Sequence, residues 1–145
     1  MFLWRISNFA DLSGKGGLVA DGRWHSRGNP VLYCSEHPAV AMLEVLVHIN
    51  PATAPDDFQL IQIDCPDDIA VFAPTVSASH LRDEGWTRQT GNEFLSGGDC
   101  CLMRIPSAVM PLASNIIVNP LHADAARLAV ISVDRHPFDN RLFRR

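Results

Sequence analysis

The stretch VLYCSEHPAVAMLEVLVH, residues 31–48, decides the fold because it predicts a buried strand followed directly by an apolar helix. The β-branched and aromatic residues of 31–35 are typical of a strand. Ser35 is the expected N-cap of the helix, and Pro38 is compatible with its first turn. Asn50, which precedes a proline, is expected to end it.

Glu44 is the single charged residue between Ala39 and Val47, in a helix that is otherwise apolar on every side. Such a helix is normally buried, and a buried carboxylate needs compensation for the water that it loses. Two readings stay open. Glu44 lies on an exposed edge and pairs with His48, one turn later, or it faces a cavity or a cationic partner.

The other segments predict more short strands than helices. The expected strands lie at 58–65, 69–74, 100–107, 114–120 and 128–138. A short helix is expected within 77–86 and an exposed connection at 91–99, and the first thirty residues are typical of loops with short strands at most. Because the strands do not alternate regularly with helices, the pattern predicts an α+β fold, as one domain over residues 1–145.

Composition excludes several classes of protein. The 145 residues are 47% hydrophobic and carry a formal net charge of −4, which gives no basic field to attract nucleic acid. No apolar run has the length of a membrane span and no signal peptide is evident, so a cytoplasmic location is expected. The four cysteines lack zinc spacing, so reduced, mostly buried thiols and no bound metal are expected.

The segment DGRWHSRGNPVLY, residues 21–33, places Arg23 and Arg27 among turn residues that lead into a strand carrying Tyr33. The planar fork of an arginine suits the recognition of a phosphate or carboxylate. The alternatives are surface arginines whose stems pack on a neighbouring tryptophan, and a tyrosine of the core. If the strand and the following helix share a cleft, Tyr33 lies near the carboxylate of Glu44.

Two further motifs of the chain have simpler structural explanations. The glycine-rich SGKGG, residues 13–17, does not match the pattern of a phosphate-binding P-loop. Ser107 follows an expected strand and lies between two prolines in RIPSAVMP, residues 104–111, which is typical of a turn or cap residue.

Four blocks of the chain resemble the RES domain family, which is named for an arginine, a glutamate and a serine. They are DGRWHSRGNPVLYCSEHPAVAMLEVLVH (21–48), which DLSGKGG (11–17) precedes, PSAVMP (106–111), SNIIVNPLH (114–122) and PFDNRL (137–142). The blocks occur in the expected order and span nearly the whole chain. The first block is highly specific for this family, and the second and third are moderately so.

The resemblance implies which residues form the site. By position, the family arginine corresponds to Arg23, the glutamate to Glu44 and the serine to Ser107, which are therefore the expected catalytic residues. Arg5 matches a second arginine near the family's N-terminus, and Tyr33 matches an aromatic residue. The resemblance implies that Arg5, Arg23 and Tyr33 bind the substrate NAD+, with no metal.

The resemblance also implies a function. Members of the family are toxins of type II toxin–antitoxin systems, and their fold, with short strands in two small sheets flanked by helices, is similar to that of ADP-ribosyltransferase toxins. They act on NAD+: some cleave it by hydrolysis or phosphorolysis, and others transfer ADP-ribose to a protein. The implied partner is an Xre-like antitoxin that blocks the active site. Any contact with DNA would be made by this antitoxin. The complex can also contain a homo-oligomer of the toxin.

A mechanism follows from these roles. Cleavage of the nicotinamide–ribose bond develops positive charge on the ribose, which the carboxylate of Glu44 is suited to stabilise. Arg5 and Arg23 would bind the pyrophosphate and supply counter-charge to that carboxylate, Tyr33 would stack on nicotinamide, and Ser107 would donate a hydrogen bond to the substrate.

Several points stay open at this stage. The acceptor of ADP-ribose can be water, phosphate or a protein, and a non-enzymatic module that holds a nucleotide or peptide is the rival class of function. The chain departs from the family pattern at Ser114, where many members have a glutamate, and at His25 and Arg27. The sequence assigns no role to Ser114, whereas His25 and Arg27, which stand where an asparagine and a less charged residue are common in the family, can alter the affinity for the substrate.

Overall fold

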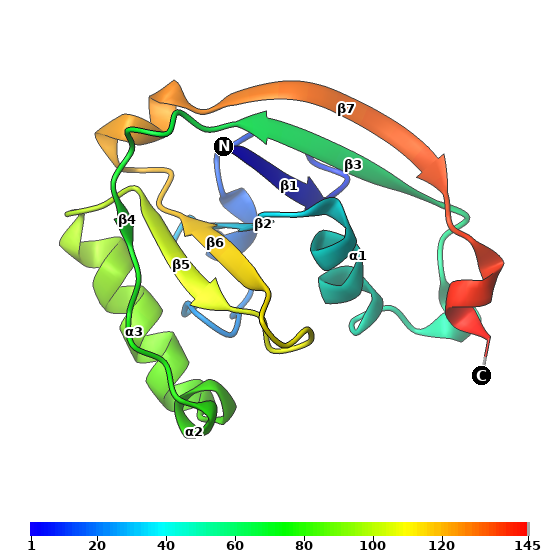
Figure 1. Cartoon of the computed structure of the whole chain (residues 1–145), viewed down its shortest axis with the longest axis horizontal. Coiled ribbons are helices and arrows are strands. Elements are labelled where there is room, and N and C mark those ends of the chain that lie inside the picture. Colours follow the sequence, from blue (N-terminus) through cyan, green and yellow to red (C-terminus); the bar gives the residue numbers. More distant parts are fainter. Residues whose placement is uncertain (145) are drawn as a thin grey trace.

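Seven strands form one sheet in the order β4-β5-β6-β2-β1-β3-β7 (Figure 1). The computed structural model describes residues 1–144. The strands are β1 (Phe2–Ile6), β2 (Leu32–Ser35), β3 (Asp57–Asp64), β4 (Val71–Phe72), β5 (Leu102–Pro106), β6 (Ser114–Val118) and β7 (Ala129–Pro137). Neighbouring strands are antiparallel except β4 and β5, which are parallel. The expected strands are confirmed, although the one at 69–74 is only two residues long.

The helices of the described chain pack on this sheet or connect its strands (Figure 1). They are the α-helices α1 (Pro38–Leu46), α2 (Ala78–Arg82) and α3 (Glu84–Gly97), and the short 3-10 helices η1 (Lys15–Leu18), η2 (Pro51–Thr53), η3 (Ala123–Arg127) and η4 (Asn140–Phe143). The N-cap of α1 is His37, whose side chain accepts the backbone N–H of Ala39. The prediction of Ser35 as the cap is wrong, because β2 continues through Ser35.

The α+β class is confirmed, but the division into two small sheets is wrong. The seven strands are continuous, yet β1 and β2 pair only at Trp4 and Ser35. That single pair joins β4-β5-β6-β2 to β1-β3-β7. The pairing of strands is therefore almost interrupted between the two halves of the sheet. Helix α1 packs against β1 and β2 at this join.

Both faces of the central strands are buried, as the alternation of their side chains requires. On β6, Ile116 and Val118 belong to one buried cluster, together with Leu3 and Ile61 from the other half of the sheet. Ile117, between them, belongs to a second cluster. The members of this second cluster are Trp24, Val31, Phe94, Met103, Ile105 and Ile117. Phe94 shows that α3 covers this face.

The prediction of an exposed connection at 91–99 is wrong, because α3 continues through Gly97. Glycine usually weakens a helix, and this segment contains three, Gly91, Gly97 and Gly98. In the structure, a Cβ atom on Gly91 would lie 1.6 Å from the carbonyl oxygen of Trp24. This glycine therefore lets α3 lie directly on the backbone of the segment that carries Arg23.

Two other expectations can be compared with the fold. All four cysteines are free thiols, and Cys34, Cys65 and Cys101 are buried, as expected. Within residues 1–144, no helix combines the length and the apolar character needed to cross a membrane.

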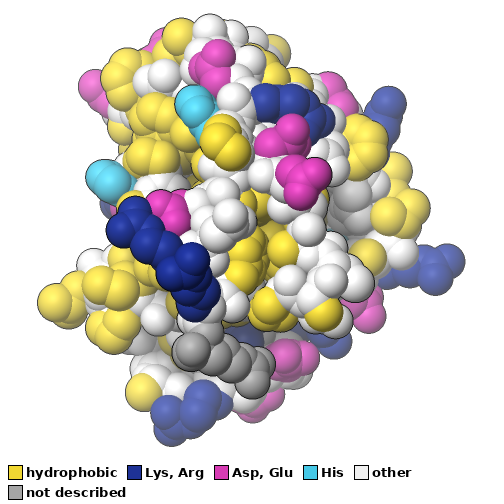
Figure 2. Space-filling view, turned by 90° about the vertical axis from the view of Figure 1, so that its right-hand side faces the viewer, with side chains coloured by type: hydrophobic (Ala, Val, Ile, Leu, Met, Phe, Trp, Pro, Cys, Tyr) yellow, Lys and Arg dark blue, Asp and Glu magenta, His cyan; other side chains and the backbone are white. Residues whose placement is uncertain are grey.

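Figure 2 views the end of the molecule near the C-terminus, where Lys and Arg side chains are scattered among acidic and hydrophobic ones.

Candidate functional site

A cleft of about 1070 Å³ lies at the join between the two halves of the sheet. Residues from β1, β2 and α1 line it, together with the segment from 19 to 25 and the start of the loop after β5. Its lining includes four of the five expected site residues: Arg5, Arg23, Tyr33 and Glu44. The topology therefore brings together side chains that are up to 39 positions apart in the sequence (44 − 5).

The carboxylate of Glu44 is held by two neutral donors. The hydroxyl of Ser107 donates to Oε1 of Glu44 at 2.6 Å, and Nδ2 of Asn115 donates to the same oxygen at 2.7 Å. In the described chain no donor reaches the other oxygen, Oε2, and Glu44 lines the cleft. One carboxylate oxygen is thus fixed by the protein while the other is available to a ligand.

The sequence-based readings of Glu44 are only partly correct. The helix is not buried on all sides: Ala41 is its one buried residue, and Val47 at its end is 57% exposed. Within residues 1–144 no ion pair involves Glu44, so neither the expected His48 pair nor a direct arginine counter-charge forms. Hydrogen bonds from Ser107 and Asn115 stabilise the carboxylate instead.

Ser107 is buried and is the turn residue that its sequence context predicts. Its Oγ accepts the backbone N–H groups of Val109 and Met110, at 3.1 and 3.0 Å, and so closes the turn after β5. The same hydroxyl donates its proton to Glu44. Ser107 itself is not part of the cleft wall, so it reaches the site through Glu44.

Arg23 is fixed to the two helices α2 and α3. Its Nη1 donates to the carbonyl of Leu81 at 2.8 Å, and its own carbonyl accepts the hydroxyl of Thr87 at 2.7 Å. Thr87 is fully buried, so this contact is shielded from water. Arg5, on β1, donates to the carbonyl of Asp11 at 3.3 Å and faces the same cleft.

Tyr33 turns its hydroxyl into the protein, and the residue as a whole is 36% exposed. The hydroxyl lies 2.7 Å from Nδ1 of His25 and accepts the backbone N–H of Trp24. Nε2 of His25 lies 2.8 Å from the carbonyl of Ala20, and so must carry the proton. Tyr33 therefore donates to Nδ1, and burial of the phenol raises the pKa of Tyr33 to about 12. The ring of Tyr33, and not its hydroxyl, is the part available to a ligand.

Sequence reasoning missed Asn115, Ser35 and Arg88. Asn115 binds the carboxylate, and its Oδ1 accepts the hydroxyl of Ser35 at 2.7 Å. Arg88 lines the cleft from α3, and its Nε donates to the carbonyl of Gly22. The available signals were weak, because Asn115 lies in an ordinary strand pattern and Arg88 in a segment whose helix was not recognised.

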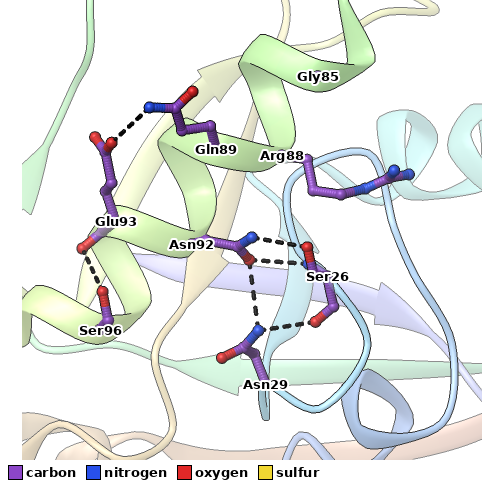
Figure 3. Close-up of a pocket in the computed structure, with 8 residues that line it drawn as sticks. All are labelled: Ser26, Asn29, Gly85, Arg88, Gln89, Asn92, Glu93 and Ser96. Atoms are coloured by element: carbon purple, nitrogen blue, oxygen red, sulfur yellow. Dashed lines mark hydrogen bonds between the residues drawn. The ribbon is translucent and has the colours of Figure 1, made fainter.

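A second hollow, of about 500 Å³, lies between α3 and the segment from Ser26 to Asn29 (Figure 3). Oδ1 of Asn92 accepts the backbone N–H of Ser26 and Nδ2 of Asn29, and Nδ2 of Asn92 donates to the hydroxyl of Ser26. Arg88 points away from this network. Its polar groups satisfy one another, which indicates a clamp between the loop and the helix. Within residues 1–144 no cluster of three or more His, Cys, Asp or Glu side chains could hold a metal ion.

Comparison with known proteins identifies a family that matches nearly the whole chain. The RES domain family matches residues 2–140. The chain is 43% identical to a protein named Toxin Res from Pseudomonas putida KT2440, over 99% of this chain and all of the relative. It is 29% identical to a Prs ADP-ribosylating toxin from Sphingobium sp. YBL2, over 98% of this chain and 96% of that protein.

A solved structure shares the fold. A chain in the crystal structure of the M. tuberculosis MbcT–MbcA toxin–antitoxin complex superposes with a TM-score of 0.75. The superposition covers 98% of this chain and 86% of the other, at 17% sequence identity. At that identity, the likeness concerns the fold alone.

Proposed function

Because this chain belongs to the RES domain family, we propose that it is an NAD+-consuming toxin of a type II toxin–antitoxin system, which cleaves the nicotinamide–ribose bond. The observation that carries the proposal is the geometry of Glu44. Its Oε1 is held by two hydrogen bonds, its Oε2 accepts none from the described residues, and Glu44 lines a cleft together with arginines and a tyrosine.

The catalytic chemistry rests on Glu44. When the bond to nicotinamide breaks, the ribose gains positive charge, and a fixed carboxylate stabilises that charge without having to reorganise. Nicotinamide departs as a neutral molecule, so the leaving group needs no strong general acid. Oε2 is also positioned to accept a hydrogen bond from a ribose hydroxyl or from an attacking water.

Binding of the substrate is assigned to the other residues of the cleft. Arg5 and Arg23 recognise the pyrophosphate, since guanidinium groups match phosphate oxygens in geometry and charge. The exposed ring of Tyr33 stacks on the nicotinamide. Ser107 acts through Glu44, which changes its expected role from a direct substrate contact to support of the carboxylate.

The acceptor of ADP-ribose distinguishes two versions of this reaction. Water or phosphate would make the chain a glycohydrolase or phosphorylase. The resemblance to a relative named for ADP-ribosylation favours a second candidate, transfer of ADP-ribose to a protein. Incubation with NAD+ labelled on the adenylate separates them, because label on a protein band identifies transfer, whereas free ADP-ribose or its phosphate ester identifies cleavage.

A neutralising antitoxin of the Xre-like type is the proposed partner, because an active enzyme of this kind would deplete its own cytoplasm of NAD+. Exposed apolar side chains border the cleft: Phe9 is 74% exposed, Val19 73% and Val47 57%. A segment of the antitoxin that covers the cleft would bury them together with Glu44. With a net charge of −4, the toxin would contact DNA only through this partner.

Release of nicotinamide by the antitoxin-free protein is the test of the proposed function. Glu44→Gln should reduce the rate by about 100-fold or more while the circular dichroism spectrum stays unchanged. Glu36→Gln is the matched control, because Glu36 lies just before α1 but pairs with Arg104 outside the cleft. If the parent protein binds NAD+ but releases no nicotinamide, the chain is a binding module and the proposal fails.

A further inference from the structure

The structure connects Glu44 to Asn115 and Ser35, two residues to which the sequence assigned no catalytic role. We propose that Asn115 and Ser35 are positioning residues that fix the direction of the Glu44 carboxylate, an inference that rests on the proposed function. Ser35 orients the amide of Asn115, and the amide in turn holds Oε1 so that Oε2 points to the substrate.

The backbone places Ser35 and Asn115 side by side. Ser35 on β2 and Asn115 on β6 are direct partners in the antiparallel register, so their side chains project from the same face of the sheet. Their side chains meet, with the hydroxyl of Ser35 donating to Oδ1 of Asn115 at 2.7 Å. Ser35 is only 3% exposed, so water competes little for this bond.

The direction of the hydrogen bonds follows from the chemistry of the groups. A carboxylate only accepts, so the side of the Asn115 amide that faces Glu44 must be its NH2 group. Oδ1 then faces Ser35, whose hydroxyl can donate to it. If the amide turned over, its oxygen would face the carboxylate and the bond to Glu44 would be lost, although the Ser35 hydroxyl could then accept a hydrogen bond from the NH2 group. The relay from Ser35 to Asn115 to Glu44 therefore has one favourable arrangement.

Both bonds to Glu44 end on the same oxygen, and this decides what they do. A glutamate side chain on a half-exposed helix has several rotatable bonds, and fixing it loses entropy. Ser107, in the turn after β5, and Asn115, on β6, both donate to Oε1. The carboxylate is therefore restrained by two separate segments of the chain. A fixed carboxylate is the condition for the electrostatic stabilisation proposed for the reaction.

Asn115→Asp is the decisive variant because it keeps the shape and changes the chemistry. Two carboxylates in contact do not both ionise readily, so the pair retains a proton to higher pH than a single glutamate does. The acid limb of the kcat profile should therefore move upward by about one pH unit or more. Asn50→Asp is the matched control and should leave the limb unmoved, since Asn50 is exposed, does not line the cleft and caps η2 through a side-chain oxygen that aspartate keeps.

Other titratable groups stay constant in this comparison. The elements packed on α1 contribute Arg5 from β1 and Tyr33 from β2, and His48 follows the helix itself. Arg23, in the segment from 19 to 25, and Arg88, on α3, also line the cleft. Because none of these differs between parent and variant, a displaced limb reports the pair of residues 44 and 115.

Ser35 gives a second, milder test. Ser35→Ala removes the donor to Oδ1, and kcat should fall by about 3- to 10-fold with little change in KM, while Ser35→Thr, which keeps a hydroxyl, should restore most of it. A purely structural role would instead lower the midpoint of unfolding without separating kcat from KM.

The outcomes separate this inference from the proposed function. If the parent cleaves NAD+ and Asn115→Asp leaves the acid limb in place, the positioning role is refuted and the function stands. If the parent does not cleave NAD+, the carbon-13 resonance of the Glu44 carboxyl group, assigned by its loss in Glu44→Gln, still reports the relay. Its titration should move upward in Asn115→Asp, and an unchanged titration refutes the relay. If Asn115→Asp does not fold, the kcat values of the two Ser35 variants decide.

Discussion

Two parts of the cleft hold their functional groups in different ways. The carboxylate network, formed by Ser35, Glu44, Ser107 and Asn115, consists of bonds between side chains from four separate segments. The arginine loop, residues 20–27, is held mainly through its backbone. Its carbonyl and N–H groups bond to the side chains of Thr87, Arg88, Asn92 and Tyr33.

The difference has a physical consequence. Bonds between side chains fix the direction of one charge, so a change in the network should affect the chemical step more than the stability of the fold. Bonds to the backbone fix the path of the chain, so a change in the supports of the arginine loop should affect stability and substrate binding together. Substitutions in the two parts of the cleft test this division, from the largest expected effect to the smallest.

Gly91→Ala should have the largest effect, because it disrupts the support of the whole arginine loop. The new methyl group would overlap the carbonyl of Trp24, whose backbone cannot move without moving Arg23. We expect a loss of about 1–3 kcal/mol in the free energy of unfolding, as for other overpacked sites, with a raised KM for NAD+. Urea denaturation measures the first quantity. Gly97→Ala is the control, since that glycine of α3 has an uncrowded Cβ position, and equal losses in the two variants would contradict the prediction.

The Gly91 contact also shows where sequence reasoning stops. The strand and helix at 31–48 and the anomaly of Glu44 could be predicted, because hydrophobic pattern and charge are local properties. Local pattern also suggests that glycine ends a helix, and only the tertiary structure shows that Gly91 is required for the approach of a backbone 67 residues away (91 − 24).

Long-range pairing limited the prediction of the site in the same way. Asn115 and Ser35 become partners only through the register of β2 with β6, which no local pattern encodes. The family resemblance indicated Glu44 and Ser107 as residues of one site, but not that one supports the other. It also suggested arginine counter-charge at Glu44, where the structure has two neutral donors.

Arg23→Ala should have the next largest effect, on substrate binding. Removal of a guanidinium that contacts phosphate should raise KM by about 10- to 100-fold with a smaller change in kcat. Arg27→Ala is the matched control, because Arg27 lies on the same loop, is exposed and does not line the cleft. Steady-state kinetics with NAD+ measures both variants. A KM equal to that of the parent would refute a phosphate contact for Arg23.

Ser107→Ala should act on kcat. It removes one of the two donors to Glu44 and the acceptor for two N–H groups of the following turn. We expect kcat to fall by about 10-fold, the usual effect of one lost hydrogen bond to a charged group, with KM nearly constant. The contrast with Arg23→Ala is the sharpest comparison of the two parts of the cleft. If Ser107→Ala raised KM and left kcat unchanged, Ser107 would contact the substrate and not support Glu44.

The smallest effect concerns the proton of Tyr33, which reports whether the arginine loop is in place. Tyr33 is the only tyrosine of the chain, so phenolate absorbance measures this residue alone. In the folded protein the pKa of Tyr33 is raised by burial to about 12, whereas in denaturant it should return to the ordinary value of 10.0. Because the folded state keeps a proton that the unfolded chain releases, stability should fall as the pH rises from about 10 to about 12. Circular dichroism at each pH separates ionisation from unfolding. A folded-state midpoint near the ordinary value would mean that the hydroxyl faces solvent, and the bond that fixes the ring to His25 would be refuted.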